Sequence, residues 1–479
     1  MKIAIAGASG FVGQMLLEAL SPDYDCVALG RSVPAASASS GRREIVWRNC
    51  DLFSLLQTQE GLAGVDVAIY LVHSMLPRAS LTQSSFEDCD LVLADNFARA
   101  AKAAGVQRVI YLGGLIPDVL ELSDHLRSRR EVEVALASQG ASVTTLRAGL
   151  ILGAQGSSFQ MLYLLVKRLP VMLCPRWTRS LTQCIAATDV VELIRFCIAQ
   201  PQTAGRTFDI GSPEVLTYRD LMRTLGRELG KKTPYYYVPF FTPGLSQLWV
   251  QLITGASPNL VGPLIQSLRH EMVVRDPALL QMYGKPLVGV QEALRRCLTK
   301  IRPTLRNATR QRVRQLRGNP EVRSIQRLVL PRGKTAAWVA EEYFQWLPAF
   351  LKPFVRVDRL DHDTWVFRFA LLKWPLLVLW LCRERSTSDR QLFYIRGGLL
   401  VKKDQNPHSR LEFREVLGRQ WVLAAIHEFR PALPWPLYKY TQALAHLWVM
   451  RGFRKHLLGR ARTMALRSPG EDTGSGVPS

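Results

Sequence analysis

The chain has 479 residues, 48% of them hydrophobic and 21% charged, and a formal net charge of +23. This composition excludes an intrinsically disordered or collagen-like chain, and the length exceeds one domain of ~150 residues. The excess of basic residues is compatible with binding to nucleic acid, to an anionic membrane or to anionic ligands, or with an ordinary basic surface. The eight cysteines form no CxxC pair, which favours buried free thiols over disulfides or a metal site.

The first residues predict a strand rather than a secretory signal, because Met1 and Lys2 lead directly into the apolar run 3–6. In the C-terminal half, the longest apolar stretch covers residues 374–382. A spanning helix needs ~20 residues. We therefore expect a cytoplasmic protein with at most peripheral contact with a membrane.

Residues 1–150 alternate apolar strand patterns with amphipathic helix patterns. This alternation predicts a parallel sheet covered on both faces, which is the doubly wound α/β Rossmann class. The strand patterns cover residues 3–6, 26–29, 67–72, 108–112 and 142–146, and the helix patterns cover 12–20, 95–104 and 126–137.

Mixed patterns with longer loops follow to about residue 300 and predict a small substrate lobe, giving a first domain over 1–300. Residues 301–334 hold ten Lys or Arg and one acid, so we expect a basic linker. An arm for nucleic acid or acidic lipid is the alternative, but no aromatic residues interleave to stack on bases, so no nucleic acid is expected. Strand patterns and a long last helix over 435–458 predict an α+β domain over 335–465, before a disordered tail over 466–479.

The best-defined motif is a glycine loop between the first strand and the first helix. Gly7 allows a tight turn, Gly10 lets a pyrophosphate approach the backbone, and Gly13 permits close packing of helix on strand. The N-terminus of the following helix offers free N–H groups and partial positive charge to phosphates. The loop therefore predicts a dinucleotide site formed by Gly7, Ser9, Gly10, Phe11, Val12 and Gly13.

The end of the second strand predicts which dinucleotide is preferred. An acid there would bond the adenosine ribose 2′-hydroxyl, but this chain has Gly30-Arg31-Ser32. Arg31 can pair with a 2′-phosphate, so NADP(H) is expected over NAD(H), which stays possible. The alternative is that Arg31 is a solvated loop residue.

Several short motifs are spread over the first 300 residues: Gly7–Gly13, Gly30-Arg31, Cys50-Asp51-Leu52, Leu71-Val72-His73, Ala104-Gly105-Val106, Tyr111-Leu112-Gly113-Gly114, Leu146-Arg147-Ala148-Gly149, Thr188-Asp189-Val190 and Phe208-Asp209-Ile210-Gly211-Ser212. Together they resemble the extended or atypical branch of the short-chain dehydrogenase/reductase superfamily. The resemblance implies that Asp51 and Leu52 contact the adenine. It also implies that Leu71, Val72 and His73 line the cofactor cleft.

The chain departs from this superfamily at its catalytic residues, which are a Ser or Thr and a YxxxK pair. Gly113 and Gly114 stand where the hydroxyl residue is expected, and His125 and Arg129 have the spacing of the Tyr and the Lys. Residues four apart share one helical face. A His can exchange protons near neutral pH, whereas an Arg can hold a ribose or phosphate but cannot act as a base. We expect either a His125/Arg129 catalytic pair or a loss of catalysis.

The C-terminal half has a looser resemblance, to an uncharacterised domain fused to some bacterial atypical short-chain reductases. It rests on residues 393–399, 410–414 and 434–438. The resemblance implies a START-like helix-grip fold, in which a curved sheet and a long helix enclose an apolar pocket. Aromatic residues would then line a cavity or form an ordinary core; they are Trp365, Phe367, Tyr394, Phe413 and Trp421.

Two functions remain open from the sequence. The first is an NAD(P)-dependent oxidoreductase acting on an apolar carbonyl or quinone-type substrate. The second is a noncatalytic dinucleotide-binding sensor or assembly protein, since the N-terminal half also resembles the accessory subunit of respiratory complex I. A third idea is peripheral membrane contact through the apolar, aromatic run 235–252, with burial under the lobe as its alternative.

Overall fold

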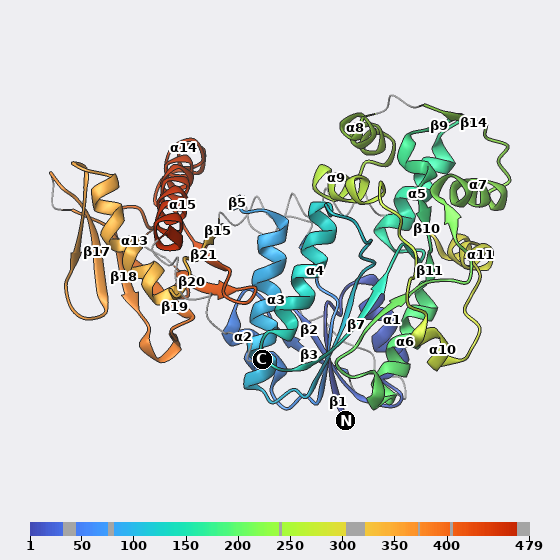
Figure 1. Ribbon diagram of the computed structural model, residues 1–479, viewed down its shortest axis with the longest axis horizontal. Helices are drawn as coiled ribbons and strands as arrows, with labels where there is room; N and C mark the ends of the chain where they lie inside the picture. The colour runs from blue at the N-terminus through green and yellow to red at the C-terminus, as the bar shows by residue number, and fades with distance from the viewer. Residues whose placement is uncertain are drawn as a thin grey trace, which may run out of the picture. The chain divides into compact units, whose positions relative to one another are not determined.

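The computed structural model describes residues 1–31, 45–74, 81–238, 242–302, 321–371, 374–402 and 406–466. The chain divides into two compact units. The first comprises residues 1–76 and 90–314, and the second comprises residues 77–89 and 315–479. Each unit has its own sheet, and Figure 1 shows the elements of both.

The first unit is built on a seven-stranded sheet in which every neighbouring pair of strands is parallel. In sheet order the strands are β12 (Thr207–Ile210), β7 (Ser142–Ala148), β6 (Arg108–Gly114), β4 (Val67–Tyr70), β1 (Lys2–Ala6), β2 (Asp25–Gly30) and β3 (Val46–Asn49). The chain order reverses between β1 and β4. Ligands of such sheets bind beyond the carboxyl ends of the strands at this switch point. The predicted Rossmann α/β class is confirmed for this unit.

Helices cover this sheet on both faces, as its continuously apolar strands require. On one face α1 contacts α6, and on the other α4 contacts β6 and β7. The helices around the sheet are α1 (Phe11–Leu20), α2 (Leu55–Leu62), α3 (Phe86–Ala103), α4 (Asp124–Ala137), α6 (Ala187–Ala199) and α10 (Ala278–Tyr283). The fully buried strand residues Ile3, Ile5, Ile69 and Ile110 are the centre of one core.

A smaller lobe stands beyond the carboxyl ends of the strands, with its helices around an apolar interior (Figure 1). Its helices are α5 (Ser157–Arg168), α7 (Tyr218–Glu228), α8 (Pro243–Thr254), α9 (Pro258–Ser267) and α11 (Val290–Lys300), with a 3-10 turn η1 (Arg176–Arg179). Short two-stranded pairings complete it: β8 (Ile151–Leu152) with β11 (Ile185–Ala186), β9 (Met172–Cys174) with β14 (Tyr235–Tyr237), and β10 (Leu181–Thr182) with β13 (Leu216–Thr217).

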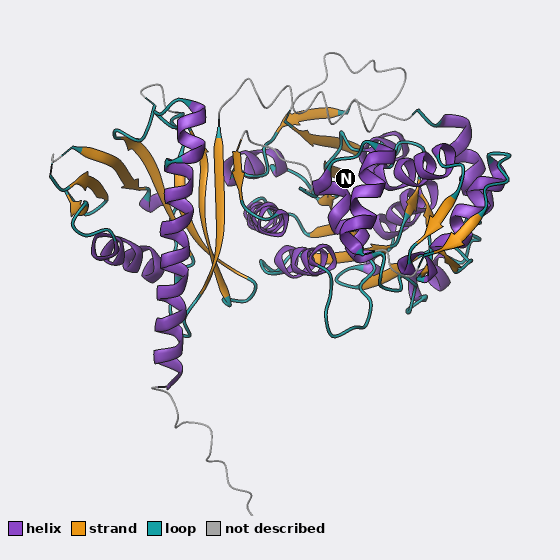
Figure 2. Cartoon of the chain, turned by 90° about the horizontal axis from the view of Figure 1, so that it is seen from above, coloured by secondary structure: helices purple, strands orange, loops and turns teal. Residues whose placement is uncertain are grey.

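The second unit holds an eight-stranded sheet whose neighbours are antiparallel, except for β15 and β5, which are parallel. Its strands in sheet order are β16 (Val355–Arg359), β17 (Thr364–Phe369), β18 (Pro375–Leu381), β19 (Arg390–Gly397), β20 (Arg410–Val416), β21 (Trp421–Phe429), β15 (Val322–Val329) and β5 (Leu81–Gln83). Its helices are α13 (Ala336–Phe350), α14 (Trp435–Tyr440) and α15 (Gln442–Leu466), the last of which is the long helix in Figure 2. Side chains of α13, α15 and the sheet form one core.

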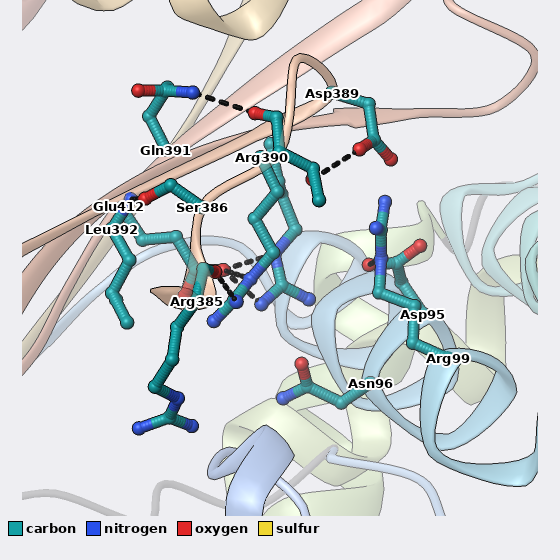
Figure 3. Close-up of polar contacts among 12 residues, drawn as sticks. Asp95, Asn96, Arg99, Arg385, Ser386, Asp389, Arg390, Gln391, Leu392 and Glu412 are labelled. Atoms are coloured by element: carbon teal, nitrogen blue, oxygen red, sulfur yellow. Dashed lines mark hydrogen bonds and ion pairs between the residues drawn. The ribbon is translucent and has the colours of Figure 1, made fainter. Parts of the chain in front are cut away.

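The same sheet carries a buried charged cluster on β19 and β20. Glu412 accepts hydrogen bonds from the guanidinium groups of Arg390 and Arg414, and all three side chains are almost fully buried. Figure 3 shows the Arg390 side chain directed at Glu412. Burial alone would raise the pKa of Glu412, but the two guanidinium groups hold it well below its ordinary value. Glu412 is therefore a carboxylate in the folded chain.

Two sequence-based expectations for the C-terminal half need correction, and a third, the disordered tail, lies almost wholly outside the described residues. Residues 322–329 form the paired strand β15, although they fall within the expected linker; residues 303–320 of that linker lie outside the described residues. The expected single helix over 435–458 is broken at Thr441, whose backbone is not helical, and the second helix continues to Leu466. Residues 467–479 of the expected tail are not described.

The aromatic residues expected to line a cavity divide between different environments. Trp365, Phe367 and Phe413 belong to the core of the second unit, where the ring of Trp365 stacks on that of Phe344 with centroids 5.1 Å apart. Tyr394 instead stacks on Trp380, and its hydroxyl accepts a hydrogen bond of 2.6 Å from Arg385. Trp421 is half-buried beside the guanidinium of Arg327. These contacts are those of side-chain packing.

The eight cysteines have free thiols and are buried, as the sequence predicted. Burial raises the pKa of the Cys184 thiol to about 12, so it stays protonated and unreactive at neutral pH. In the described part of the chain, no helix is long and apolar enough to cross a bilayer.

Candidate functional site

The glycine loop forms a tight turn between β1 and α1. Gly7 has a φ of +89°, and its carbonyl accepts a hydrogen bond of 2.9 Å from the Gly10 N–H. A Cβ at Gly13 would lie 2.3 Å from the Gly7 carbonyl oxygen, so only glycine permits this approach of α1 to the strand end. The first N–H groups of α1 lack partners within the helix. The turn thus has the backbone shape and the donors that suit a pyrophosphate.

A continuous cleft of about 550 Å³ begins at this turn and extends into the lobe. Its lining is mainly apolar, and it includes seven of the predicted cofactor residues together with both predicted catalytic residues. These are Gly7, Gly10, Phe11, Val12, Gly13, Leu71, His73, His125 and Arg129. A volume of ~300–1,000 Å³ is usual for small-molecule sites.

The other predicted cofactor residues lie around the cleft rather than in its lining. Ser9 is exposed within the glycine turn, and Val72 is buried after β4. Arg31 is exposed just after β2. Asp51 and Leu52 follow β3, where the Leu52 carbonyl accepts a hydrogen bond of 2.8 Å from Asn96 on α3. Arg31, Asp51 and Leu52 thus follow the carboxyl ends of neighbouring strands, where an adenosine half would extend from the pyrophosphate turn.

His125 lies in the first turn of α4 and lines the cleft. The residue as a whole is half-buried, but its Nδ1 atom is inaccessible to solvent. Burial, then the positive charge of Arg129, then His73 lower the pKa of His125 to about 3. The imidazole ring is therefore neutral at physiological pH. It can donate or accept a hydrogen bond, but it is not an imidazolium that could act as an acid.

The buried Arg129 is paired with a carboxylate, that of Asp90, which the sequence analysis did not predict. Its guanidinium pairs with Asp90 on α3, and both side chains are almost fully buried. Asp90 also accepts hydrogen bonds from the Ser74 N–H at 2.6 Å and from the Ser128 hydroxyl at 3.3 Å. The charge of Arg129 is thus compensated within the fold, while part of its side chain still lines the cleft.

Tyr111 on β6 lies near Arg129 and is fully buried. Burial, opposed by the nearby Arg129, raises the pKa of Tyr111 to about 12. The phenol is absent from the cleft lining, so it cannot stand in for the missing tyrosine of the YxxxK pair.

The two glycines at the end of β6 differ in the space around them. A Cβ at Gly113 would lie 2.8 Å from the Tyr111 ring, whereas a Cβ at Gly114 would meet only Arg129 Cγ, at 3.5 Å. Both glycines line the cleft. A hydroxyl side chain therefore fits at Gly114 but not at Gly113.

A serine that the sequence interpretation did not single out also lines the cleft. Ser267 is the last residue of α9, and its hydroxyl lies 2.9 Å from that of Ser123, the N-cap of α4. The Ser267 hydroxyl also donates to the Pro263 carbonyl, at 3.0 Å. The contact between the Ser267 and Ser123 hydroxyls connects the start of α4, where His125 lies, to α9 of the lobe. Nothing in the local sequence pattern marks Ser267.

The deep end of the cleft is an apolar chamber walled by α5, α8 and α9. Met161 and Leu165 come from α5, Val250 from α8, and Leu260 and Ile265 from α9. The indole of Trp177, on η1, also lines it. The arrangement can bind an apolar molecule next to the nicotinamide end of a dinucleotide.

Comparison with known proteins defines the class of the N-terminal unit. Residues 7–161 match the NAD(P)H-binding family. Together with the fold, this match shows that residues 7–161 lie in an NAD(P)H-binding Rossmann domain.

Among curated proteins, the chain is 32% identical over 113 residues to the auxiliary protein GraX of Staphylococcus aureus. That alignment covers 24% of this chain and 36% of GraX, so the match spans about a third of that relative.

Three solved structures share the fold, each with a TM-score of 0.50. A nucleoside-diphosphate-sugar epimerase from Staphylococcus aureus is 17% identical and is covered completely by 62% of this chain. A triphenylmethane reductase from Citrobacter sp. is 17% identical, with 63% of this chain covering all of it. An NADPH-dependent quinone oxidoreductase from Escherichia coli, complexed with NADPH, is 19% identical, with 62% of this chain covering all of it. At these identities the likeness concerns the fold.

Proposed function

We propose that this chain is an NADP(H)-dependent oxidoreductase that reduces an apolar quinone-type or carbonyl substrate. The observation that carries the proposal is the single cleft that joins the glycine turn to the apolar chamber. NADPH, when bound, supplies a hydride to an acceptor next to its nicotinamide. Reductases with this fold occur among the solved neighbours, which supports the proposal.

The preference for NADP(H) over NAD(H) rests on the end of β2. Arg31 is exposed there, and the sequence Gly30-Arg31-Ser32 at the end of this strand contains no acid. A guanidinium favours a 2′-phosphate through charge-assisted hydrogen bonds. The quinone oxidoreductase neighbour was solved with NADPH, which agrees with this preference.

The state of His125 favours a quinone over a simple ketone or aldehyde as substrate. A neutral imidazole is a poor acid, so it protonates a strongly basic alkoxide less readily than an imidazolium would. A reduced quinone is a much weaker base and takes its protons from water or from a hydrogen-bonding partner. His125 then orients the substrate oxygen, while the chamber residues exclude water around the ring.

The test measures NADPH binding and NADPH oxidation separately on the purified chain. Binding is followed by calorimetry, and turnover by the loss of NADPH absorbance with naphthoquinones, benzoquinones and aldehydes. Replacing the half-buried Leu264, which lines the chamber, by Trp should raise KM for the quinone at least tenfold and leave the Kd of NADPH unchanged. Gln266→Trp on the exposed face of the same helix is the control. Binding without turnover of any acceptor would overturn the enzymatic proposal.

The second candidate function is a noncatalytic dinucleotide-binding sensor or assembly protein. It is favoured by one observation: the residues at the YxxxK spacing are a neutral His and an Arg whose charge is compensated by Asp90. In this case NADPH should bind and raise the unfolding temperature of the first unit, while all acceptors stay unreduced. The same two measurements therefore separate the two functions.

For the second unit we propose a START-like helix-grip domain that carries a small apolar ligand. Its antiparallel sheet and the long helix α15 support this, although the aromatic side chains fill much of the interior. Native mass spectrometry of the purified chain should reveal a bound lipid or isoprenoid mass. A ligand-free chain that also fails to take up lipid from vesicles would contradict the carrier role.

A further inference from the structure

We propose that the outer face of α8 and β14 docks on the surface of an anionic lipid bilayer, and that the apolar substrate enters the chamber from there. The docking follows from exposed apolar side chains, from local charge and from the position of α8 in the chamber wall. The substrate route rests on the proposed function, whereas the docking does not.

The exposed side of α8 is unusually apolar. Leu245, Leu248 and Leu252 follow one helical face and are 46%, 52% and 74% exposed. Tyr236 and Tyr237 on β14 are also exposed. Figure 1 shows α8 and β14 at the outer end of the lobe. An apolar face of this kind on a soluble domain marks a protein or membrane contact.

The two chain segments that carry this face have charged residues of one sign. Residues 157–180 and 229–270, which carry α5, η1, β14, α8 and α9, contain seven basic residues and no Asp or Glu. The basic residues are Lys167, Arg168, Arg176, Arg179, Lys231, Lys232 and Arg269. Two acids flank the second segment: Glu228, which Arg295 engages at 2.9 Å, and the exposed Glu271. Basic residues next to an anionic bilayer are attracted to its headgroups, and salt screens that attraction.

The mixture of side chains fits a bilayer interface better than a protein surface. The guanidinium of Arg179 lies over the ring of Tyr237, with 5.4 Å between them. Tyrosines and arginines with apolar stems occupy the headgroup region, while leucines enter the acyl boundary. A protein partner would need acids to match seven cations, whereas anionic headgroups supply this charge at any position.

The same helix separates this face from the chamber. Val250 points to the opposite side of α8 from Leu248 and Leu252, where it is buried and lines the cleft. It packs there in one cluster with Met161 and Leu165 on α5. Substrate that leaves the bilayer beside α8 is therefore one helix away from the chamber.

The experiment is sedimentation with vesicles of phosphatidylglycerol or of phosphatidylcholine, at low and high salt, without cofactor or substrate. We expect binding to phosphatidylglycerol that weakens with salt and far weaker binding to phosphatidylcholine. The double variant Leu248→Glu/Leu252→Glu should lower the partition coefficient at least tenfold. Arg176→Gln/Lys232→Gln should remove most of the preference for the anionic lipid.

The matched control is Leu444→Glu on α15, because Leu444 is 55% exposed, also on a helix, and lies near Arg451 and Arg454 in the sequence. Retained binding by this control together with lost binding by Leu248→Glu/Leu252→Glu supports the α8 face, and equal binding by both variants overturns it. Absence of wild-type binding, or loss of binding in the control instead of the α8 variant, overturns the proposal. If the wild type binds vesicles but reduces no quinone, the proposed function fails while the docking stands.

Discussion

The buried ion pair between Asp90 and Arg129 can be tested through its contribution to the stability of the first unit. Both side chains are almost fully buried, so solvent screens their interaction little. Removing one member leaves a buried charge without its counter-ion, which typically costs ~3–5 kcal/mol. Asp90 keeps its hydrogen bonds from Ser74 and Ser128, so we expect the lower end, about 3 kcal/mol, for Arg129→Met.

The coupling between the two residues is the more diagnostic quantity. Asp90→Asn alone leaves the Arg129 guanidinium buried without a counter-ion, so it should also lower the free energy of unfolding by about 3 kcal/mol. The double variant carries no buried charge at these two positions. We therefore expect about 3 kcal/mol for Asp90→Asn/Arg129→Met rather than the sum of about 6.

The assay is urea unfolding, in which the transition that NADPH shifts to higher urea belongs to the first unit. Each variant's midpoint is compared with the wild-type midpoint of that transition. Additive single effects, or a cost below about 1 kcal/mol for Arg129→Met, would refute the assignment of a buried, mutually compensating pair.

Three further predictions concern the cleft. Because the pKa of His125 is about 3, kcat/KM should show no step between about pH 5 and 8 that His125→Phe removes, and pH profiles of both proteins check this. Arg31→Asp should weaken NADPH binding at least tenfold and favour NADH, measured by calorimetry. Gly114→Ser should leave Tm almost unchanged, whereas Gly113→Ser, which meets the Tyr111 ring, should cost ~1–3 kcal/mol; equal losses would contradict the geometry.

The parts of the site that the sequence predicted depend on local patterns. The turn at Gly7, the close approach at Gly13 and the parallel strands all follow from residues near one another in the chain. The helix pattern and the resemblance to the YxxxK spacing together pointed to His125 and Arg129, which lie on α4 and line the cleft.

The parts that it did not predict depend on contacts between distant residues. Asp90 on α3 pairs with Arg129 on α4. Neither the types of these two residues nor their spacing in the sequence predicts that pairing. The proton state of His125 depends on how deeply its ring is buried, which a sequence does not specify. Likewise β5 is a three-residue strand without a periodic signal of its own, and it exists through its pairing with β15.

The cluster around Glu412 leads to the last prediction, which concerns the second unit. Glu412→Gln keeps the shape of the side chain but leaves the buried guanidinium groups of Arg390 and Arg414 without their shared carboxylate. We expect a loss of about 3–5 kcal/mol at neutral pH in the unfolding transition that NADPH does not shift. As a matched control, Asp363→Asn breaks the more exposed pair with Arg383 and should cost less than about 1 kcal/mol.

The sign of the pH dependence provides the discriminating measurement. The pKa of Glu412 is lower in the folded chain than in the unfolded chain, so its contribution to stability is full above an ordinary carboxyl pKa of about 4.3. It is lost as the pH falls from there through the folded-state pKa. The difference in unfolding free energy between wild type and Glu412→Gln should therefore be constant from about pH 7 to 5 and shrink below about pH 4. A difference that stays constant to the lowest pH at which the unit folds would show that Glu412 contributes through its shape and not through its charge.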